Sequence, residues 1–512
     1  MGGAILASAD VLQRIGHTTL LPRHSGPDDR GMYAAAIDPT NGYAYFVGEY
    51  LVKLDITGNL PAQVGPALDT GQSVEADIDS AAGYLYLPRG TIYRYALGAG
   101  SNAVSSAGSL TLAAGSAASI VIDDSDPNPT NHYAYVVCGS GSSTGKVAKV
   151  RLSNMTEYGS ITLNAGESNF IFCTVADVPH GYAYFLARGA GIPQVVKIKF
   201  TPGTNAPVRV GAVSLDSTNV FIDGASIDTV HGYAYYGTYD SDTNVPGRVY
   251  KVLLGDGDVA PRVVGYVGLQ SGEGRLAASI IDPQGGYVYF ADDNSYPGSV
   301  YQLSLNGTNP PVEISRLMLQ GGWSNPPPNG VTASNTTTNN DGLLPFGEVY
   351  FRSAVYDPLR GFAYFGQDSR PNQVVKVQIR SPFELWQSAN FGDNATNSAI
   401  AGDLADPDGD GLPNLLEYAL GTDPNVANVG GLPAADFETD ANGDYLTLTV
   451  NKNPSATDVT YIVEVSGDLA TWSSGPSFTT TLQNTPSLLK VRDNIPIAIA
   501  PQRFIRLRIT HP

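Results

Sequence analysis

Residues 406–417 carry the spacing of oxygen donors that a calcium ion requires. The segment reads Asp-Pro-Asp-Gly-Asp-Gly-Leu-Pro-Asn-Leu-Leu-Glu. Calcium takes roughly six to eight oxygen ligands, and a loop can supply them when a glycine at its sixth position permits a sharp turn. The predicted ligands offer three carboxylates, one backbone carbonyl, one amide oxygen or water bridge, and one bidentate carboxylate, in the order Asp406, Asp408, Asp410, Leu412, Asn414 and Glu417.

The loop resembles EF-hand, dockerin and thrombospondin type 3 calcium loops. It departs from a full EF-hand because no convincing helix enters it and Pro413 stands where an apolar residue is usual. Residues 414–420 can form a short helix that ends at Gly421, and Asp423 is a candidate for a further ligand. These features favour a structural calcium ion that stiffens a linker in a calcium-rich extracellular setting. The alternative is an acidic turn that stays solvated.

Other residues that could do chemistry are few. His132, His180 and His231 occupy the same turn position in three separate repeats, which favours a structural role over a metal site. The glycine-rich segment 139–146 lacks a required glycine and a following helix, so it is no phosphate loop. The sequence assigns no catalytic residue. The least poor candidates for an enzyme are carboxylates predicted on loops near an axial funnel: Asp292, Asp293, Asp240 and Glu49.

The elements that would position these residues belong to a phrase repeated seven times. It reads Asp, a short turn and then Gly-Tyr-X-Tyr, and the first aromatic residues of the copies are Tyr43, Tyr84, Tyr133, Tyr182, Tyr233, Tyr287 and Phe362. Such a period indicates a repeat architecture. Each repeat contains strand-like runs, which in the fourth copy cover residues 170–176, 182–187, 194–200 and 207–215. Four antiparallel strands per repeat are typical of a β-propeller blade.

The seventh repeat has three strand-like runs and lacks the fourth. The missing pattern occurs ahead of the first repeat, at residues 12–20. We therefore predict that this N-terminal strand completes the seventh blade, which closes the ring and removes a bare sheet edge. Residues 10–380 resemble the repeat propellers of large secreted bacterial surface proteins. The resemblance implies the fold more than the function, because propellers host unrelated activities.

The predicted fold class is all-β, with three parts. A seven-bladed β-propeller covers residues 1–380 and contains a polar insertion at 320–347, a linker with the calcium loop covers 381–425, and a small β-sandwich covers 426–512. The sandwich is predicted from strands with alternating apolar residues after position 445. A calcium loop followed by a sandwich looks like the tail module of secreted bacterial surface proteins, which implies adhesion, sorting or assembly.

Composition limits the partners. The chain has 512 residues, of which 29 are basic and 48 are acidic, so its net charge is −19. This charge repels nucleic acid and anionic membranes and attracts divalent cations. No apolar stretch is long enough to span a bilayer.

Ala7-Ser8-Ala9 resembles a signal-cleavage site, but the apolar stretch before it is too short, which favours a mature or trimmed chain. Whether Cys138 and Cys173 pair stays open.

The predicted function is that of a non-enzymatic, extracellular or cell-surface protein that acts in interaction, adhesion or assembly, as a subunit of a fibre or layer. Its partners would be a protein or glycan at the propeller rim, or further copies of the chain. The alternatives are a carbohydrate-active propeller enzyme, either lyase or glycosidase, and a glycan-binding lectin that uses rim aromatics such as Tyr239 and Tyr296.

Overall fold

The computed structural model divides into two compact units. One is Leu12–Ile379, and the other contains the chain from Arg380 onward. The structure describes residues 12–20, 31–139, 144–168, 173–188, 191–215, 221–239, 246–270, 274–293, 298–319, 348–368, 372–427 and 430–511. The predicted insertion at 320–347, the Ala7-Ser8-Ala9 triplet and the candidates Asp240 and Tyr296 lie outside the described residues.

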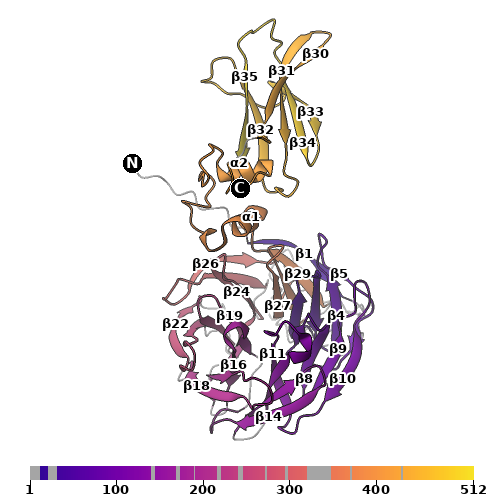
Figure 1. The fold of residues 1–512 in the computed structure, drawn as a ribbon, viewed down its shortest axis with the longest axis vertical. Coiled ribbons are helices and arrows are strands. Elements are labelled where there is room, and N and C mark those ends of the chain that lie inside the picture. The colour runs from indigo at the N-terminus through magenta and orange to yellow at the C-terminus, as the bar shows by residue number, and fades with distance from the viewer. Residues whose placement is uncertain are drawn as a thin grey trace, which may run out of the picture. The chain divides into compact units, whose positions relative to one another are not determined.

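The unit Leu12–Ile379 is built from antiparallel sheets that follow one another along the chain and stand side by side in a ring (Figure 1). Its described residues form seven sheets. The first three contain β2 (Ala34–Asp38), β3 (Tyr43–Val47), β4 (Tyr50–Asp55), β5 (Ala62–Gln63) and β6 (Leu68–Asp69); β7 (Asp77–Asp79), β8 (Tyr84–Arg89), β9 (Thr91–Ala96) and β10 (Ser105–Leu110); and β11 (Ala117–Asp123), β12 (Tyr133–Cys138), β13 (Lys146–Arg151) and β14 (Thr156–Thr162).

The remaining four sheets follow the same order from first to last strand. They contain β15 (Val175–Asp177), β16 (Tyr182–Ala187), β17 (Gln194–Lys199) and β18 (Val208–Ser214); β19 (Phe221–Asp228), β20 (Tyr233–Tyr239), β21 (Arg248–Leu253) and β22 (Arg262–Gly268); β23 (Leu276–Asp282), β24 (Tyr287–Asp292), β25 (Ser299–Ser304) and β26 (Val312–Met318); and β27 (Phe351–Asp357), β28 (Phe362–Gln367), β29 (Gln373–Gln378) and β1 (Gln13–Thr19).

The first strands of neighbouring sheets contact one another. The contacts run from β2 to β7, β11, β15, β19, β23 and β27 in turn, and β27 also contacts β2. The apolar core lies between adjacent sheets: one cluster joins Val137 and Val147 of the third sheet to Phe185 and Val196 of the fourth. The prediction of an all-β repeat protein with propeller-like sheets is confirmed.

The repeated phrase is the turn from the first strand into the second. Its aspartate ends the first strand and accepts a hydrogen bond from the turn, since Ala82 N donates to Asp79 Oδ1 at 2.9 Å. The glycine of the phrase has left-handed φ values, 78° at Gly83 and 80° at Gly286, which residues with a Cβ rarely adopt. The sequence phrase therefore specifies one tight turn in six of the seven sheets, whereas the third sheet has a longer turn that contains Pro129–Asn131 and ends at His132.

A buried lysine in the third strand ties most sheets to the next. Lys197 is fully buried, and its Nζ donates to Gly255 O at 2.5 Å and Gly257 O at 2.7 Å, in the turn between the third and fourth strands of the following sheet. The same Nζ lies 4.1 Å from the ring centroid of Tyr182, the first aromatic of its own repeat. Equivalent lysines make equivalent contacts at Lys53, Lys149, Lys251 and Lys376.

The sixth sheet has glutamine where five others have this lysine. Gln302 lies opposite Tyr289 in the register in which Lys197 lies opposite Tyr184. The sheet that follows has no turn between its third and fourth strands, because β1 comes from the other end of this unit. The sixth sheet therefore has Gln302 in place of lysine, and the seventh sheet beside it has no turn whose carbonyl groups a lysine could reach. Lys376 of the next sheet donates to Gly58 O in the first sheet at 3.0 Å.

β1 pairs antiparallel with β29, from Gln13 opposite Gln378 to Thr19 opposite Gln373. A fork of hydrogen bonds supports this pairing. Arg14 Nε donates to Glu348 Oε2 at 2.7 Å, and His17 Nδ1 lies 2.8 Å from Glu348 Oε1. Glu348 is buried, so this charged contact is shielded from solvent.

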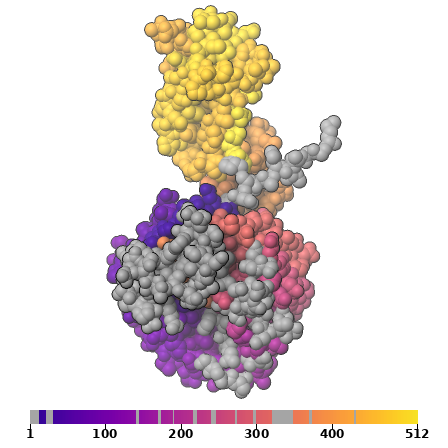
Figure 2. Space-filling model, turned by 180° about the vertical axis from the view of Figure 1, so that it is seen from behind, coloured from indigo at the N-terminus to yellow at the C-terminus, as the bar shows by residue number. Residues whose placement is uncertain are grey.

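The described residues of the second unit form two sheets and two short α-helices. One sheet has the order β30 (Ala434–Asp440), β31 (Gly443–Asn451), β34 (Leu488–Asp493) and β33 (Thr479–Asn484), and the other pairs β32 (Thr460–Ser466) with β35 (Phe504–Thr510). Val450 and Val491 of the first sheet share an apolar cluster with Val463 of the second. Figure 2 shows the surfaces of both units from behind in the colours of Figure 1.

The residues predicted as a linker form helices that pack within this unit. Helix α1 (Pro382–Phe391) begins with a capping box between Ser381 and Glu384, and helix α2 (Asn414–Leu420) ends at Gly421 with φ 76°. Phe383 of α1 and Tyr418 of α2 lie in one apolar cluster, and Leu420 of α2 belongs to the cluster of the two sheets. The loop before α2 is therefore supported by the core of its own unit.

Candidate functional site

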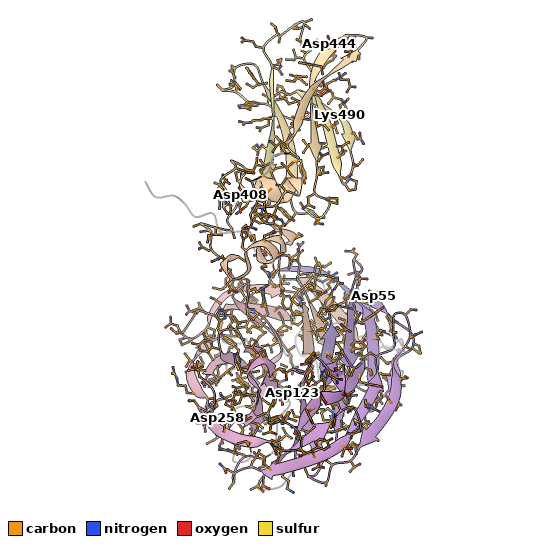
Figure 3. All side chains as sticks on the ribbon, viewed as in Figure 1. Asp55, Asp123, Asp258, Asp408, Asp444 and Lys490 are labelled. Carbon is orange, nitrogen blue, oxygen red and sulfur yellow. The ribbon has the colours of Figure 1, made fainter. Side chains whose placement is uncertain are left out.

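The three aspartates of the predicted calcium loop converge. Asp406, Asp408 and Asp410 each offer a carboxylate oxygen, and these oxygens all lie within 4.8 Å of one another. Figure 3 labels Asp408 in the segment between α1 and α2. Within the described ranges, no other three His, Cys, Asp or Glu side chains converge in this way. Hard oxygen donors at such separations suit calcium.

Hydrogen bonds inside the loop hold these carboxylates in place. Asp406 accepts from Gly409 N and Gly411 N, each at 2.9 Å, and Asp410 Oδ1 accepts from Leu412 N at 2.8 Å. Gly409 and Gly411 have φ values of 75° and 91°, which favour glycine. The chain thus wraps around its own acidic side chains in the way the sequence spacing predicts.

Two buried side-chain oxygen atoms of the loop show whether its residues fit a cation. Asn414 Oδ1 and Asp408 Oδ2 are buried and accept no hydrogen bond. The amide of Asn414 is oriented by its Nδ2, which donates to Ile400 O at 2.8 Å and Gly402 O at 3.0 Å. An unsatisfied buried polar atom costs about 1–3 kcal/mol. A calcium ion would satisfy such oxygens, so the residues present fit this metal.

Electrostatics in the loop also favour a cation. The pKa of Asp408 is raised, first by desolvation and then by repulsion from Asp410 and Asp406. A bound divalent ion would relieve that repulsion. Glu417 lies in the first turn of α2, where it is buried and its Oε1 accepts from Thr422 Oγ1 at 3.3 Å. It does not belong to the converging group of three aspartates.

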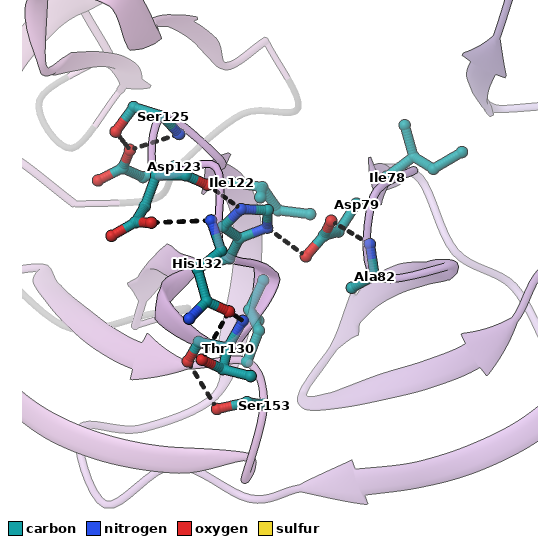
Figure 4. Close-up of polar contacts among 12 residues, drawn as sticks. Ile78, Asp79, Ala82, Ile122, Asp123, Ser125, Thr130, His132 and Ser153 are labelled. Carbon is teal, nitrogen blue, oxygen red and sulfur yellow. Dashed lines mark hydrogen bonds and ion pairs between the residues drawn. The ribbon is translucent and has the colours of Figure 1, made fainter. Parts of the chain in front are cut away.

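The repeated histidines are turn residues of separate sheets. His180 Nδ1 lies 2.7 Å from Asp177 of its own turn. His132 is buried, and its ring joins Asp79 Oδ2 of the preceding sheet at 2.8 Å to Asp126 O at 2.7 Å (Figure 4). Desolvation opposes the charged ring, but these two hydrogen bonds outweigh it and raise the pKa of His132. His132 therefore ties two sheets together.

Among the described carboxylates proposed for an enzyme, Asp292 and Asp293 have different surroundings. The expectation that Asp292 lies on a loop is wrong: it is the last residue of β24, it is buried, and Tyr301 Oη donates to its Oδ2 at 3.1 Å. This hydrogen bond gives it a packing role. The next residue, Asp293, lies 2.8 Å from Arg352, and Arg352 lines a cavity of the same unit.

A cavity of about 420 Å³ lies at the centre of the ring of sheets. It is lined by residues at or before the first strands of six repeats, including Glu75, Asp223, Ser279 and Arg352. Because the first strands contact one another around the ring, this cavity lies on the axis. A second cavity of about 300 Å³ shares Glu75 and Thr174 with it. The two spaces therefore adjoin.

The sequence contained a signal for this cavity that was missed. Four residues before the repeated aspartate, the second repeat has Glu75, whereas the other six repeats have small residues: Ala34, Ser119, Cys173, Gly224, Ala278 and Ser353. Small side chains at this position leave space on the axis, and one charged exception projects into it. Aligning the first strands by their terminal aspartate would have found Glu75.

Cys138 and Cys173 are buried free thiols. Burial raises the pKa of Cys138 to about 12, which suppresses the reactive thiolate. Cys138 ends β12, as expected, but Cys173 precedes β15 and was wrongly expected inside a strand.

Among the described residues, no helix is long and apolar enough to cross a membrane.

No family model and no curated protein matches this chain. Solved structures match it at low identity and with TM-scores below 0.5. A protein from Lactobacillus plantarum is 13% identical with a TM-score of 0.41, over 60% of this chain and 96% of that one. U3-55K is 11% identical with a TM-score of 0.47, over 71% and 99%. The WD40 repeats of RRP9 are 11% identical with a TM-score of 0.46, over 72% and 100%.

Proposed function

We propose that this chain is an extracellular, non-enzymatic interaction and assembly protein with a structural calcium ion. It consists of a seven-bladed β-propeller closed by its N-terminal strand, a calcium-organised segment and a C-terminal β-sandwich. The observation that carries the proposal is the convergence of Asp406, Asp408 and Asp410 beside the buried, unsatisfied Asn414 Oδ1. A site of this kind fills where free calcium is high, which favours the cell exterior.

Ring closure is supported by the pairing of β1 with β29 and by the lysine contacts. Lys376 reaches the first sheet. The second sheet has Arg94 at the lysine position, which also donates to the following sheet, whereas the glutamine, Gln302, directly precedes the sheet completed by β1. In this arrangement β1 covers the outer edge of β29, which would otherwise be open to unwanted pairing.

Assembly is supported by the edges of the C-terminal sheet. β30 is an edge strand whose Phe437 is 61% exposed, and the opposite edge strand β33 exposes Leu482. Unpaired strand edges with exposed apolar side chains can add a strand from another chain. Copies of this protein would then join through their C-terminal sheets.

Calcium binding is tested by titrating the calcium-free protein in a calorimeter. We expect one calcium ion per chain and a rise in the melting temperature of the C-terminal unit, followed by tryptophan fluorescence in a Trp323→Phe background, in which Trp386 and Trp472 of that unit remain. Asp410→Asn should weaken binding at least tenfold, whereas Asp444→Asn, at an exposed position of the same unit, should not. Equal affinity in the wild type and Asp410→Asn would overturn the calcium assignment.

Assembly is tested by sedimentation with calcium and with a chelator. We expect larger species in calcium, and Phe437→Lys should reduce them without changing the melting temperature. A strict monomer at high concentration in both conditions would refute assembly. Turnover or binding on a carbohydrate panel would instead favour the enzyme or lectin alternatives.

A further inference from the structure

The axial cavity is built from small side chains and a few charged ones. Ala278, Gly224 and Ser353 line it at equivalent positions of three repeats, and they leave the axis open. Glu75 occupies the equivalent position in a fourth repeat, and Asp223 and Arg352, which directly precede Gly224 and Ser353, are the other charged side chains that line the cavity. The small residues at equivalent positions of the repeats therefore leave the space open, and the charged side chains make it polar.

Two acidic side chains are fixed along the inner edge of β11. Glu75 Oε2 accepts from Ile120 N at 3.1 Å, and Asp77 Oδ2 accepts from Ile122 N at 2.8 Å. Glu75 Oε1 also accepts from Thr174 N at 3.2 Å, so its carboxylate bridges two sheets. Because the two N–H groups on β11 are two residues apart, the carboxylates are separated by about 7 Å.

A second acidic group surrounds Arg352. Its guanidinium lies 2.9 Å from Asp223, 2.8 Å from Asp293 and 3.8 Å from Asp368. One cation thus faces three carboxylates. Desolvation raises the pKa of Asp293 to about 7, with Asp223 and Asp368 adding repulsion against the attraction of Arg352 and Arg275.

The balance of charge around the two cavities is negative. The acidic groups are Glu75, Asp77, Asp124, Asp223, Asp293 and Asp368, and the basic groups beside them are Arg352, Arg275 and Arg188. Desolvation is the main cause that raises the pKa of Glu75 to about 7 and that of Asp77 to about 7. A positively charged ligand would lower these pKa values by favouring the ionised carboxylates.

The spacing of the acids selects the kind of cation. A metal ion needs several oxygens at one point, and within the described residues only the loop at 406–410 brings three such groups together. The axial carboxylates are instead spread along the cavities. Separate carboxylates suit a ligand with separate positive charges, and about 420 Å³ plus the adjoining space admits an aliphatic chain.

We propose that the axial cavities bind a small organic cation with two or more amino groups, held by the carboxylates of Glu75, Asp77 and Asp223. The amino groups would donate to these oxygens, and the alanine-lined wall would contact the methylene groups between them. This site lies within the unit Leu12–Ile379 and is separate from the calcium loop.

The test is calorimetric titration of the calcium-saturated full chain with spermidine at pH 8 and 150 mM salt. We expect one spermidine per chain, and at least tenfold weaker binding at pH 6, where the carboxylic acids with pKa near 7 are protonated. Tetraethylene glycol, a neutral chain of similar length, should not bind. No binding of spermidine, or equal binding of the neutral chain, would overturn the proposal.

Variants locate the site. Glu75→Gln and Asp223→Asn should each weaken spermidine binding at least tenfold, with near-ultraviolet circular dichroism as a check on folding. Asp256→Asn removes an exposed carboxylate of the same unit and should leave binding unchanged. Should one axial variant fail to fold, the other decides. Binding that is unchanged in the folded axial variant, or equally weakened in Asp256→Asn, would show diffuse attraction to an acidic surface and refute the site.

Discussion

The buried lysines predict how strongly one sheet depends on the next. Lys197 Nζ reaches four carbonyl oxygens of the following sheet, at Leu254, Gly255, Gly257 and Val259, between 2.5 and 3.1 Å. An ammonium group has three N–H donors, and each hydrogen bond to a charged group contributes about 1.5–3 kcal/mol. Desolvation, which lowers the pKa of Lys197, offsets part of that gain. We expect Lys197→Met to reduce the free energy of unfolding by about 3–5 kcal/mol.

Gln302 is the matched control, because it has the equivalent register in the sixth sheet. Its side chain makes neutral hydrogen bonds with Tyr289 and Ser315 only within its own sheet. Gln302→Met should therefore cost about 1–2 kcal/mol. In a Trp323→Phe background, urea denaturation followed by tyrosine circular dichroism reports mainly the ring, which holds most of the tyrosines, while Trp386 and Trp472 report the other unit. If Lys197→Met costs no more than Gln302→Met, the lysines do not tie the sheets together.

Three further predictions concern calcium, closure and pH. Asp408→Asn should abolish the rise in melting temperature that calcium produces in the wild type, measured by tryptophan fluorescence; an undiminished rise would exclude the loop. Glu348→Gln weakens the fork to Arg14 and should destabilise the ring by about 2–3 kcal/mol in urea denaturation, and no change would show that the fork does not support β1. Glu75 has a folded pKa of about 7, above its ordinary value of 4.5, so the folded state holds the extra proton and the ring loses stability as pH rises from about 4 to about 7. Glu75→Gln should remove this loss and raise the free energy of unfolding at pH 8 by up to about 3 kcal/mol, with little effect at pH 4; an unaltered pH dependence would contradict the pKa.

The sequence predicts those parts of the structure that depend on neighbouring residues. The run at 182–187 is β16, because the glycine and aspartate before it determine the turn locally. The helix at 414–420 is α2, ended by Gly421 in the left-handed conformation. The loop aspartates converge because their spacing alone brings them around one turn.

Features that depend on distant residues were not predictable in the same way. His132 looks like a turn residue in sequence, and only the packing of two sheets shows that it reaches Asp79. The burial of Asn414 depends on the carbonyl groups at positions 400 and 402, which no motif contains. Aligned repeats single out Glu75 by its residue type, but the backbone N–H groups that fix its carboxylate belong to two other repeats and are identified only by the fold.

The pairing of β1 with β29 has a consequence for biosynthesis. Thr19 is synthesised more than 350 residues before its partner Gln373. At about 5–20 residues per second, the early segment waits roughly 20–70 seconds for that partner. During this interval the strand-forming sequence Gln13–Thr19 has no native partner, so the seventh sheet can be completed only after the chain has been synthesised as far as Gln378.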